Sequence, residues 1–547
     1  MTDRPPGAAW RDRALTALGV TRFDLLVIGG GIVGCGVARD AALRGLRVAL
    51  VEQDDFASGT SSRSSRLVHG GVRYLEHGHL HLVFESSRER RRLLRLAPHL
   101  VRPLAFTWPV YEGARVAQWK LLAGLTLYDA LALFRNVGNH RRLTPEGVVA
   151  REPMLTTVGL VGGATYWDAS TNDTRLTLAN ALGAQRAGAT LLNHARVTSL
   201  VTAGGRASGA VVRDVESGAE VTVRARVVVS AVGPWTNALQ PLEGGGESPA
   251  VLGSAGVHVA VPRERVGNRD AITLVAPQDG RVMFVLPAGT HTIIGTTETT
   301  ATRGPDDVRA TREEVRYLLD ACNASFPAAH LRDEDVVAAW SGIRPLAATL
   351  AEDDAGSVSR EHTVSEGPLG VLWVTGGKLT TYRAMAEDVV DRACEALGDA
   401  ERSGRPFREV LLPGGAMASL AATEREVRAA VNDDEVARHL AGAYGSDWRD
   451  AWRPVRDEPA LAERLDPSLP YTGADVVHAV EREMAVTIAD ILVRRTHVAF
   501  ESRDQGQAVA RKVAALLARR LGWDATQARD ALARYEREAG RIFGIVE

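Results

Sequence analysis

The chain has 547 residues, 45% of them hydrophobic and 24% charged, and these proportions exclude a disordered or low-complexity protein. Its 65 lysines and arginines nearly balance its 67 aspartates and glutamates, which argues against a dedicated nucleic-acid-binding protein, because such proteins need a basic excess or a basic face. At roughly 100–200 residues per domain, the length allows about three or four domains.

The cysteines and the apolar runs indicate a cytoplasmic protein. The three cysteines lie far apart and form no C-x-x-C pair, so we expect neither a disulfide framework nor a metal site. Residues 1–21 contain no apolar core of the kind that a secretory signal needs. No run reaches the roughly 20 apolar residues that span a bilayer. We therefore expect a cytoplasmic protein that is at most peripheral on the inner face of the cell membrane.

The first elements predict a parallel sheet. After a short polar lead, the aliphatic run Asp24–Ile28 is followed by a glycine cluster, a helical stretch through Arg44, and a second buried run, Arg47–Glu52. Strand, glycine turn, helix and strand within about 30 residues form a βαβ unit. The runs 225–230 and 370–375 are further buried strands of the same kind.

The middle and the end of the chain follow different patterns. Between Leu252 and Glu298, turn residues separate short strands, which predicts a mostly antiparallel sheet, and Glu243–Pro249 is a loop before it. From about Leu412 onward, apolar residues recur every three or four positions, which predicts helices, and Asp524 with Gln527 is typical of the start of the last one. The expected strands are 257–261, 272–275, 282–286 and 292–296, and the expected apolar helix positions include Val476, Val480, Met484, Ile488, Leu492, Val509, Val513 and Leu517.

The glycine cluster carries a nucleotide-binding motif. Gly29, Gly31 and Gly34 fit G-x-G-x-x-G directly between a strand and a helix. The first glycine makes the tight turn, the second lets the backbone approach a pyrophosphate, and the third allows close packing of helix and strand. Glu52 ends the second strand, where a carboxylate accepts hydrogen bonds from a ribose. We interpret this unit as a dinucleotide site, with a purely structural glycine turn as the alternative.

The position of this motif favours FAD over NAD. It lies near the N-terminus, and its second strand continues into a segment, 54–71, that is rich in serine, threonine and glycine. Hydroxyl and backbone donors of this kind suit a ribityl-diphosphate chain, although a solvated serine-rich loop would have the same composition. The candidate cofactor ligands there are Thr60, Ser61, Ser62, Ser64 and Ser65.

At this point the chain resembles the family of FAD-dependent, quinone-linked glycerol-3-phosphate dehydrogenases. The resemblance runs in order from about residue 23 to 400 and continues more loosely through the helical tail. Its most specific segments are H-G-G-x-R-Y-L and G-G-K-L-T-T-Y-R. The residues that carry it are 24–36, 40–45, 56–76, 233–235, 295–297, 341–346, 359–362 and 376–383.

The resemblance implies an α/β fold of the amino-acid-oxidase-like flavoproteins. Such a protein has a Rossmann-like FAD-binding domain, an antiparallel substrate domain inserted into it, and here a C-terminal helical domain. We expect the FAD-binding domain at 22–100, 155–245 and 335–400, the substrate domain at 101–154 and 246–334, and the helical domain at 405–547. The chain departs from the family at Ser254–His258, which lacks a lysine before the histidine, at Glu298, where an aspartate is usual, and at Val232, where a threonine is usual.

The activity that the resemblance implies is the oxidation of sn-glycerol 3-phosphate to dihydroxyacetone phosphate. Hydride would pass to N5 of FAD, and the electrons would then reach a membrane quinone. Three alternatives remain open: a glycerol-3-phosphate oxidase that uses oxygen, an amino-acid oxidase on the same fold, and a non-catalytic FAD-binding protein. We expect no nucleic-acid partner, and the oligomeric state is left open, with a homodimer as one option.

The resemblance also implies the site residues. Arg344 and Arg360 would hold the phosphate, because a guanidinium can bind two oxygens at once, and Arg73 and Tyr74 would assist at the substrate. For any single arginine among so many, a surface role is the default. Further residues of the matching motifs expected to bind the cofactor are Gly233, Gly377, Leu379 and Thr380.

His258, His69 and Lys378 complete the predicted catalytic set. His258 is the candidate base, since a neutral imidazole can accept a proton near pH 7, although without the family a hydrogen-bonded core histidine on a strand would be the plainer interpretation. His69 has a rival claim beside the flavin. Lys378 is one of three lysines, whereas the other 62 of the 65 lysines and arginines are arginines. It precedes a helix that we expect to begin around Thr380. Its ammonium and the helix dipole would stabilise negative charge on the substrate or flavin.

Two apolar or basic segments have competing interpretations. Leu121–Phe134, with Trp119 and Lys120 beside it, is either a core helix or a helix that enters a membrane interface, and a quinone acceptor strengthens the second interpretation. The basic cluster Arg88–Arg92 is expected to be a solvated helix face.

Overall fold

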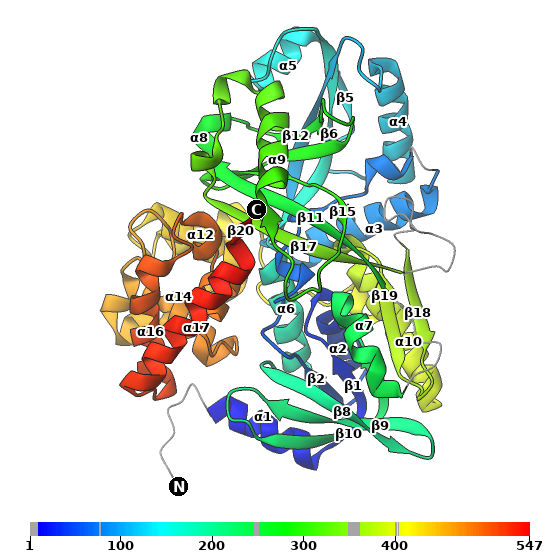
Figure 1. Cartoon of the computed structure of the whole chain (residues 1–547), viewed down its shortest axis with the longest axis vertical. Helices are drawn as coiled ribbons and strands as arrows, with labels where there is room; N and C mark the ends of the chain where they lie inside the picture. The colour runs from blue at the N-terminus through cyan, green and yellow to red at the C-terminus, as the bar shows by residue number, and fades with distance from the viewer. Residues whose placement is uncertain (1–8, 76–77, 245–250, 348–360, 400–401, 403) are drawn as a thin grey trace.

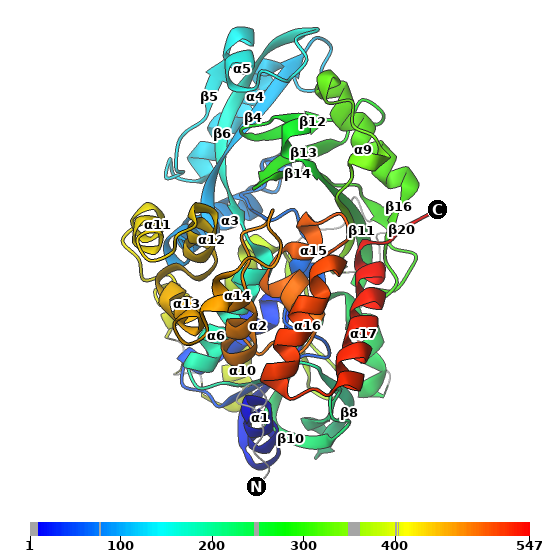
Figure 2. The same ribbon diagram turned by 90° about the vertical axis from the view of Figure 1, so that its left-hand side faces the viewer.

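Two large sheets, a small two-stranded sheet and a C-terminal helical region organise the described part of the chain. The computed structural model describes residues 9–75, 78–244, 251–347, 361–399, 402 and 404–547. The first sheet occupies one end, the second sheet the other, and the C-terminal helices lie along one side of both (Figures 1 and 2). This arrangement confirms the expected fold class, an α/β fold with a second, largely antiparallel sheet and a helical C-terminal region.

The first sheet has a parallel centre because its strands are covered on both faces. Leu25 and Val27 of β1 pack against α2, α6 and α10, whereas Phe23 and Leu26 pack on the opposite side with Leu18 of α1. Strands β19, β10, β1, β2 and β7 run parallel, and β18 joins the edge in the opposite direction. The bounds are β1 Arg22–Ile28, β2 Val48–Val51, β7 Thr190–Leu192, β10 Glu220–Ser230, β18 His362–Glu366, β19 Leu372–Gly376, α2 Ile32–Leu43, α6 Asp173–Arg186 and α10 Tyr382–Leu397.

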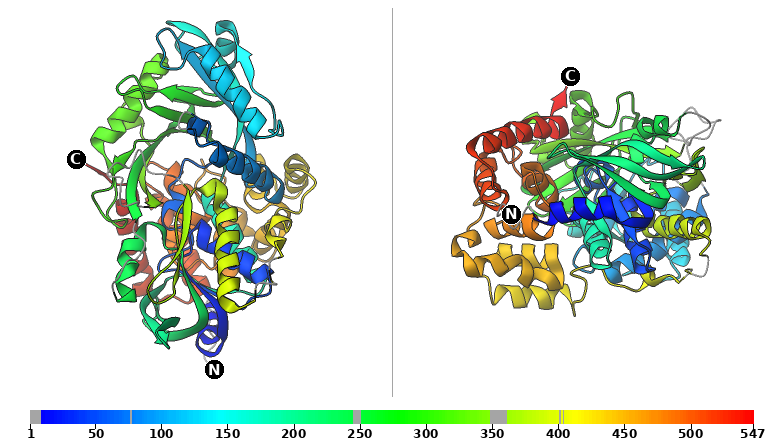
Figure 3. Two further views of the ribbon diagram at one scale, coloured as in Figure 1. Left: turned by 90° about the vertical axis from the view of Figure 1, so that its right-hand side faces the viewer. Right: turned by 90° about the horizontal axis from the view of Figure 1, so that it is seen from below.

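The N-terminal segment is more ordered than the expected polar lead. Residues Ala9–Val20 form α1, which lies against β10 and beside the ribbon of β8 (Ala195–Ala203) and β9 (Arg206–Asp214) (Figure 3). Arg11 is buried and its guanidinium pairs with Asp214 and donates to the backbone oxygen of His194 at 3.0 Å. The composition of α1 does not reveal this role, because the partners of Arg11 lie about 200 positions away in the sequence.

The second sheet is mostly antiparallel, as predicted, but it recruits more of the chain than we expected. We placed residues 155–245 and 335–400 in the FAD-binding domain, yet β6 (Leu160–Thr171) pairs with β4, and β17 (Ala338–Ala347) pairs with β11. The second sheet therefore takes strands from segments that we assigned to the FAD-binding domain, because strand pairing joins distant residues and local pattern does not reveal it. The other members are β3 Leu67–Val68, β4 Val101–Tyr111, β5 Arg141–Leu143, β11 Val251–Pro262, β12 Ala271–Val275, β13 Val282–Ala288, β14 His291–Gly295 and β15 Thr299–Thr300.

The C-terminal region is helical and shares a core with the second sheet. Phe500 packs edge-on against Trp340 of β17, with 5.1 Å between ring centroids. The predicted apolar positions of α14 and α16 are buried, and Asp524 caps α17 with Gln527 as predicted. Two details differ: Met484 leaves the helix with φ of +61°, and β20 (Ile545–Val546) pairs with β16 (Ala310–Thr311). The elements are α11 Leu420–Arg428, α12 Asp434–Tyr444, α13 Trp448–Asp457, α14 Gly473–Arg482, the π-helical η12 Asp490–Arg495, α15 Val498–Glu501, α16 Gln507–Leu521 and α17 Ala525–Phe543.

Two of the predictions concern helices beside the second sheet: the basic cluster on α3 and the apolar segment that forms α4. The basic cluster on α3 (Leu80–Leu96) is not simply a solvated face, since Arg90 is buried and pairs with Asp168, whereas Arg88 is exposed. Successive residues of a helix point in different directions, so Arg90 faces the interior and Arg88 faces the solvent. Leu121 and Tyr128 of α4 (Gln118–Leu131) join the core, but Trp119 is 74% exposed. The remaining helices here are α5 Pro145–Arg151 and α9 Arg312–Ser325.

Candidate active site

The glycine turn adopts the geometry that its motif predicts. Gly29 has φ of +108°, and a Cβ on Gly34 would lie 1.9 Å from the backbone oxygen of Gly29, so neither position accepts a side chain. The turn therefore brings the chain tightly around the start of α2, whose N–H groups favour an anion. Gly29 and Gly31 line a cavity, while Gly34 packs the helix onto the strand. This cradle fits the pyrophosphate of FAD.

Glu52 lies in the same cavity at the end of β2. The N–H groups of Gly30 and Asp54 donate to its two carboxylate oxygens, at 2.6 and 2.9 Å. Burial raises the pKa of Glu52 to about 7, against these hydrogen bonds, which favour the ionised form. Its position beside the turn suits a ribose, whose hydroxyls would donate to the carboxylate.

The serine-rich loop contributes four of its five predicted ligands to the cavity wall. Thr60, Ser61, Ser64 and Ser65 line the cavity, whereas Ser62 is buried and donates to the backbone oxygen of Gly59 at 3.2 Å. The structure therefore gives Ser62 a structural hydrogen bond in the loop. Gly233, Gly377, Leu379 and Thr380 also line the cavity.

The second sheet brings His258 and Arg344 to the same cavity. Strands β11 and β17 pair so that Ser254 lies opposite Arg344 and His258 opposite Trp340. Nη1 of Arg344 donates to Ser254 Oγ at 3.3 Å, and Glu298 Oε1 lies 3.9 Å from the same nitrogen. Ser254 and Glu298 thus both contact the guanidinium proposed for the phosphate, and Glu298 is a position where the chain departs from the family pattern.

His258 is held as a buried, neutral imidazole. Its Nε2 lies 2.8 Å from Ser65 Oγ, and its ring stacks on Trp340 with 5.5 Å between centroids. Burial, reinforced by the positive charges of Arg344 and Arg66, lowers the pKa of His258 to about 3. The imidazole at the cavity wall is therefore neutral at ordinary pH, although a pKa this low makes it a weaker base than an unperturbed histidine.

Lys378 and Tyr74 lie together on the same cavity. The Lys378 ammonium is 3.6 Å from the centre of the Tyr74 ring, within the range of a cation–π contact. The 3₁₀ turn η7 (Leu379–Thr381) begins just after Lys378 and leads into α10. His69 also lines the cavity, and its backbone N–H donates to Thr380 Oγ1 at 3.1 Å.

Two predicted residues are placed less completely. Arg73 lies in the 3₁₀ turn η2 (Val72–Leu75), next to Tyr74. Arg360 lies outside the described residues. Conversely, we missed the role of Trp340 behind His258 and the pairing of Ser65 with His258, because both join residues that are far apart in sequence.

Comparison with known proteins agrees with this geometry. Residues 24–392 match the sequence model of a family described as FAD dependent oxidoreductase, and residues 408–528 match one described as the C-terminal domain of alpha-glycerophosphate oxidase. The chain is 38% identical over 533 residues to glycerol-3-phosphate dehydrogenase of Synechocystis, covering 94% of this chain and 96% of that protein. It is 37% identical to the mitochondrial glycerol-3-phosphate dehydrogenase of Rattus norvegicus, covering 95% of this chain and 73% of that protein.

A solved structure extends the likeness to the whole fold. The glycerol-3-phosphate dehydrogenase of Bacillus halodurans, complexed with FAD, superposes with a TM-score of 0.82 at 30% identity and covers 98% of each chain. Glycine oxidase of Geobacillus kaustophilus, at 22% identity and a TM-score of 0.53, shares the fold over 68% of this chain. The chain belongs to the family of FAD-dependent glycerol-3-phosphate dehydrogenases.

Proposed function

We propose that the protein oxidises sn-glycerol 3-phosphate to dihydroxyacetone phosphate, holds FAD in the cavity described above, and passes the electrons to a membrane quinone. The observation that carries the proposal is the composition of the cavity. The glycine turn and the serine-rich loop line it together with His258, Arg344 and Lys378.

Arg344 is the anchor that we assign to the substrate phosphate. Its guanidinium contacts Ser254, Thr296 and Glu298, and it lines the cavity, where a guanidinium suits a phosphate. Arg73 and Arg360 are assigned to the same substrate on the basis of the family motifs. Together these charges would select a phosphorylated polyol over glycerol itself.

His258 is the proposed base. Oxidation of a secondary alcohol removes a proton from the hydroxyl oxygen and a hydride from the carbon that bears it, and we assign the proton to the neutral imidazole of His258, which lines the cavity. FAD supplies the two-electron acceptor for the hydride when it is bound. Ser65 and Trp340 fix the ring in place, and the Lys378 ammonium stabilises the negative charge that develops on the oxygen. His69 is the alternative base.

A membrane contact is supported by exposed apolar side chains on α3 and α4. These helices pack against each other, and their exposed apolar residues would enter the interfacial layer of a bilayer. In the part of the chain that the structure describes, no helix is long and apolar enough to cross a membrane. Peripheral binding is therefore the form of membrane contact that we propose. The exposed apolar residues are Leu80, Phe84, Trp119, Leu127, Leu133 and Phe134.

Oxygen is the second candidate acceptor, because the C-terminal residues match a domain described from an oxidase. Anaerobic titration of the purified holoenzyme tests the substrate: glycerol 3-phosphate should bleach the flavin absorbance, and glycerol or amino acids should not. Reoxidation of the bleached enzyme tests the acceptor. Rapid reoxidation by a soluble quinone with slow peroxide formation is expected, and rapid peroxide formation would replace the quinone proposal by the oxidase.

A further inference from the structure

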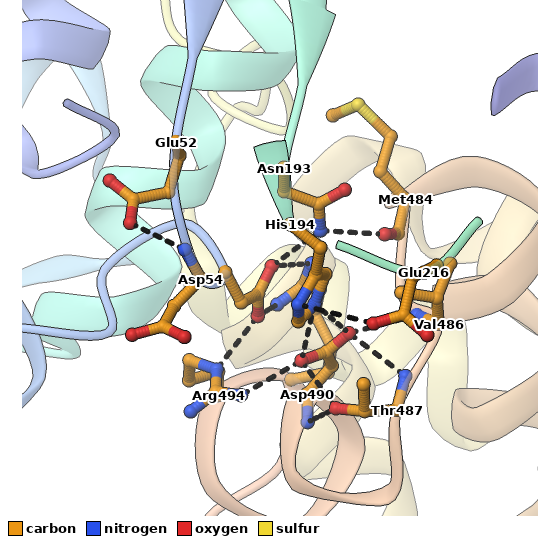
Figure 4. A network of polar contacts seen from close by, with 12 residues as sticks. Glu52, Asp54, Asn193, His194, Glu216, Met484, Val486, Thr487, Asp490 and Arg494 are labelled. Carbon is orange, nitrogen blue, oxygen red and sulfur yellow. Dashed lines mark hydrogen bonds and ion pairs between the residues drawn. The ribbon is translucent and has the colours of Figure 1, made fainter. Parts of the chain in front are cut away.

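A buried polar network joins the C-terminal region to the cofactor-binding region. It includes Asp55 in the loop after β2, His194 after β7, and Asp490 with Arg494 in η12 (Figure 4). Each of these side chains is at most 3% exposed. The cavity itself is lined by residues between Ile28 and Met385, so the C-terminal region reaches it only through such intermediates.

The network is built from ion pairs. Asp55, His194 and Asp490 place potential metal ligands within 4.8 Å of one another. However, Arg494 donates to Asp55 Oδ2 and to Asp490 Oδ1, both at 2.8 Å, and Arg495 donates to both oxygens of Asp55 at 2.5 and 2.9 Å. Two guanidinium groups already balance the two carboxylates and would repel a divalent cation. We therefore assign the cluster a positioning role.

The network holds the turn that carries Glu52. The His194 N–H donates to the backbone oxygen of Asp54 at 2.5 Å, and the Ala195 N–H donates to that of Glu52 at 2.7 Å. Asp54 in turn donates its N–H to the Glu52 carboxylate at 2.9 Å. Figure 4 shows this order, with His194 between the Glu52–Asp54 segment and Asp490. A displacement of η12 would therefore also displace Glu52, the residue assigned to the ribose.

The backbone around the network adopts a conformation that needs external support. Ala57, His194 and Met484 all have positive φ, at +67°, +49° and +61°, although none is glycine. Such conformations persist when surrounding contacts hold them. Asn193 supplies one of these contacts, because its side-chain amide donates to Asp55 Oδ1 and to the backbone oxygen of Met484, both at 2.9 Å.

We infer that the C-terminal domain is a cofactor-retention element. Arg494 and Arg495 hold Asp55, and through it the segment from Glu52 to Ser65, in the conformation that binds FAD. Docking of the domain and binding of FAD then reinforce each other, as two events that share one ordered loop must. This inference rests on the assignment of the cavity to FAD.

The first experiment measures FAD release from the holoenzyme. Asp55→Asn should release flavin at least about tenfold faster, seen as the rise in free-flavin fluorescence after dilution. The control is Asp447→Asn, which removes an exposed ion pair with Arg186 that also joins the C-terminal domain to α6 but lies outside the network. Its release rate should stay within about twofold of the parent, as expected for an exposed pair. Equal release rates for a folded Asp55→Asn and the parent would overturn the inference.

The second experiment needs no substitution in the network. Hydrogen exchange of the unmodified chain, with and without added FAD, should slow at least about fivefold at residues 484–496 when FAD is present, and stay unchanged in α11 and α12 of the same domain. Unchanged exchange at 484–496 would overturn the inference. A separate variant, Glu52→Gln, tests the cavity assignment: unaltered FAD release from that variant would contradict the assignment itself and not the coupling.

Discussion

His258 and His194 are equally buried histidines with opposite chemistry. Burial lowers the pKa of both. At His258 the positive charges of Arg344 and Arg66 add to burial, and the pKa falls to about 3. At His194 the carboxylates of Asp490 and Glu216 outweigh burial, and the pKa is raised above 6.5. The difference shows that the charges around a buried group decide the direction of its pKa shift: the histidine with the lowered pKa lies at the cavity that we assign to chemistry, and the one with the raised pKa lies in the network that joins the C-terminal region to the cofactor-binding region.

The largest effect is expected from removing the neutral histidine. His258→Gln should slow reduction of the flavin by glycerol 3-phosphate by about 10²–10⁴-fold, because the hydroxyl proton loses its acceptor. Stopped-flow absorbance of the anaerobic enzyme measures this rate. His69→Gln is the comparison, and if it causes the larger loss, His69 is the base.

Substitution of Arg344, one of the positive charges near His258, tests whether its guanidinium binds the substrate phosphate. Arg344→Gln should lower kcat/KM for glycerol 3-phosphate by about 10²–10³-fold, because a charge-assisted anchor for the phosphate is lost. Arg281→Gln is a matched control, since Arg281 also approaches Glu298, at 3.5 Å, but belongs to a different cavity. Similar losses in both variants would mean that Glu298, and not the phosphate contact, accounts for the effect.

Lys378→Arg tests whether charge alone suffices at the cavity. We expect bound FAD to be kept and flavin reduction to slow by about tenfold or more, because a planar guanidinium does not reproduce the compact ammonium that contacts the Tyr74 ring. The flavin content and the anaerobic reduction rate measure the two parts. A reduction rate close to that of the parent would show that any positive charge serves.

The smallest effect is a pH dependence that separates the two histidines. Because the pKa of folded His194 is raised, its stabilising contribution is present below pH 6.5 and is lost as the pH rises through the raised value. The pKa of folded His258 is lowered, so stability is lost as the pH falls from 6.5 toward 3. Thermal unfolding of His194→Gln should lose the alkaline decline and keep the acidic one, and His258→Gln the reverse. The same decline in both variants would refute the assignment. The charged groups that face His194 are Asp490, Glu216, Asp55 and Arg534.

The parts predicted from sequence are those set by local physics. The glycine turn, the parallel strands around it and the capping of α17 depend on residues within a few positions of one another, and their pattern is visible in the chain. His258, Arg344 and Lys378 reach one cavity as expected, but only family motifs connected them in advance.

What could not be predicted depends on contacts between distant residues. Ser65 and His258 are 193 positions apart, and the pairing of β6 and β17 into the second sheet is equally non-local. The composition of α1 gave no sign that Arg11 would be buried against Asp214. Such contacts are fixed by the packing of whole elements, which no window of sequence contains.

The pairing of Asp55 with Arg495, 440 positions later, also bears on how the protein is made. A chain emerging from the ribosome can form β1, α2 and β2 early, but Asp55 would then be a carboxylate in an apolar setting without its arginines. The nucleotide-binding half therefore stays unfinished until η12 has been synthesised and has docked. A chain whose translation stops before η12 would keep the glycine motif of the nucleotide-binding turn but would bind flavin weakly.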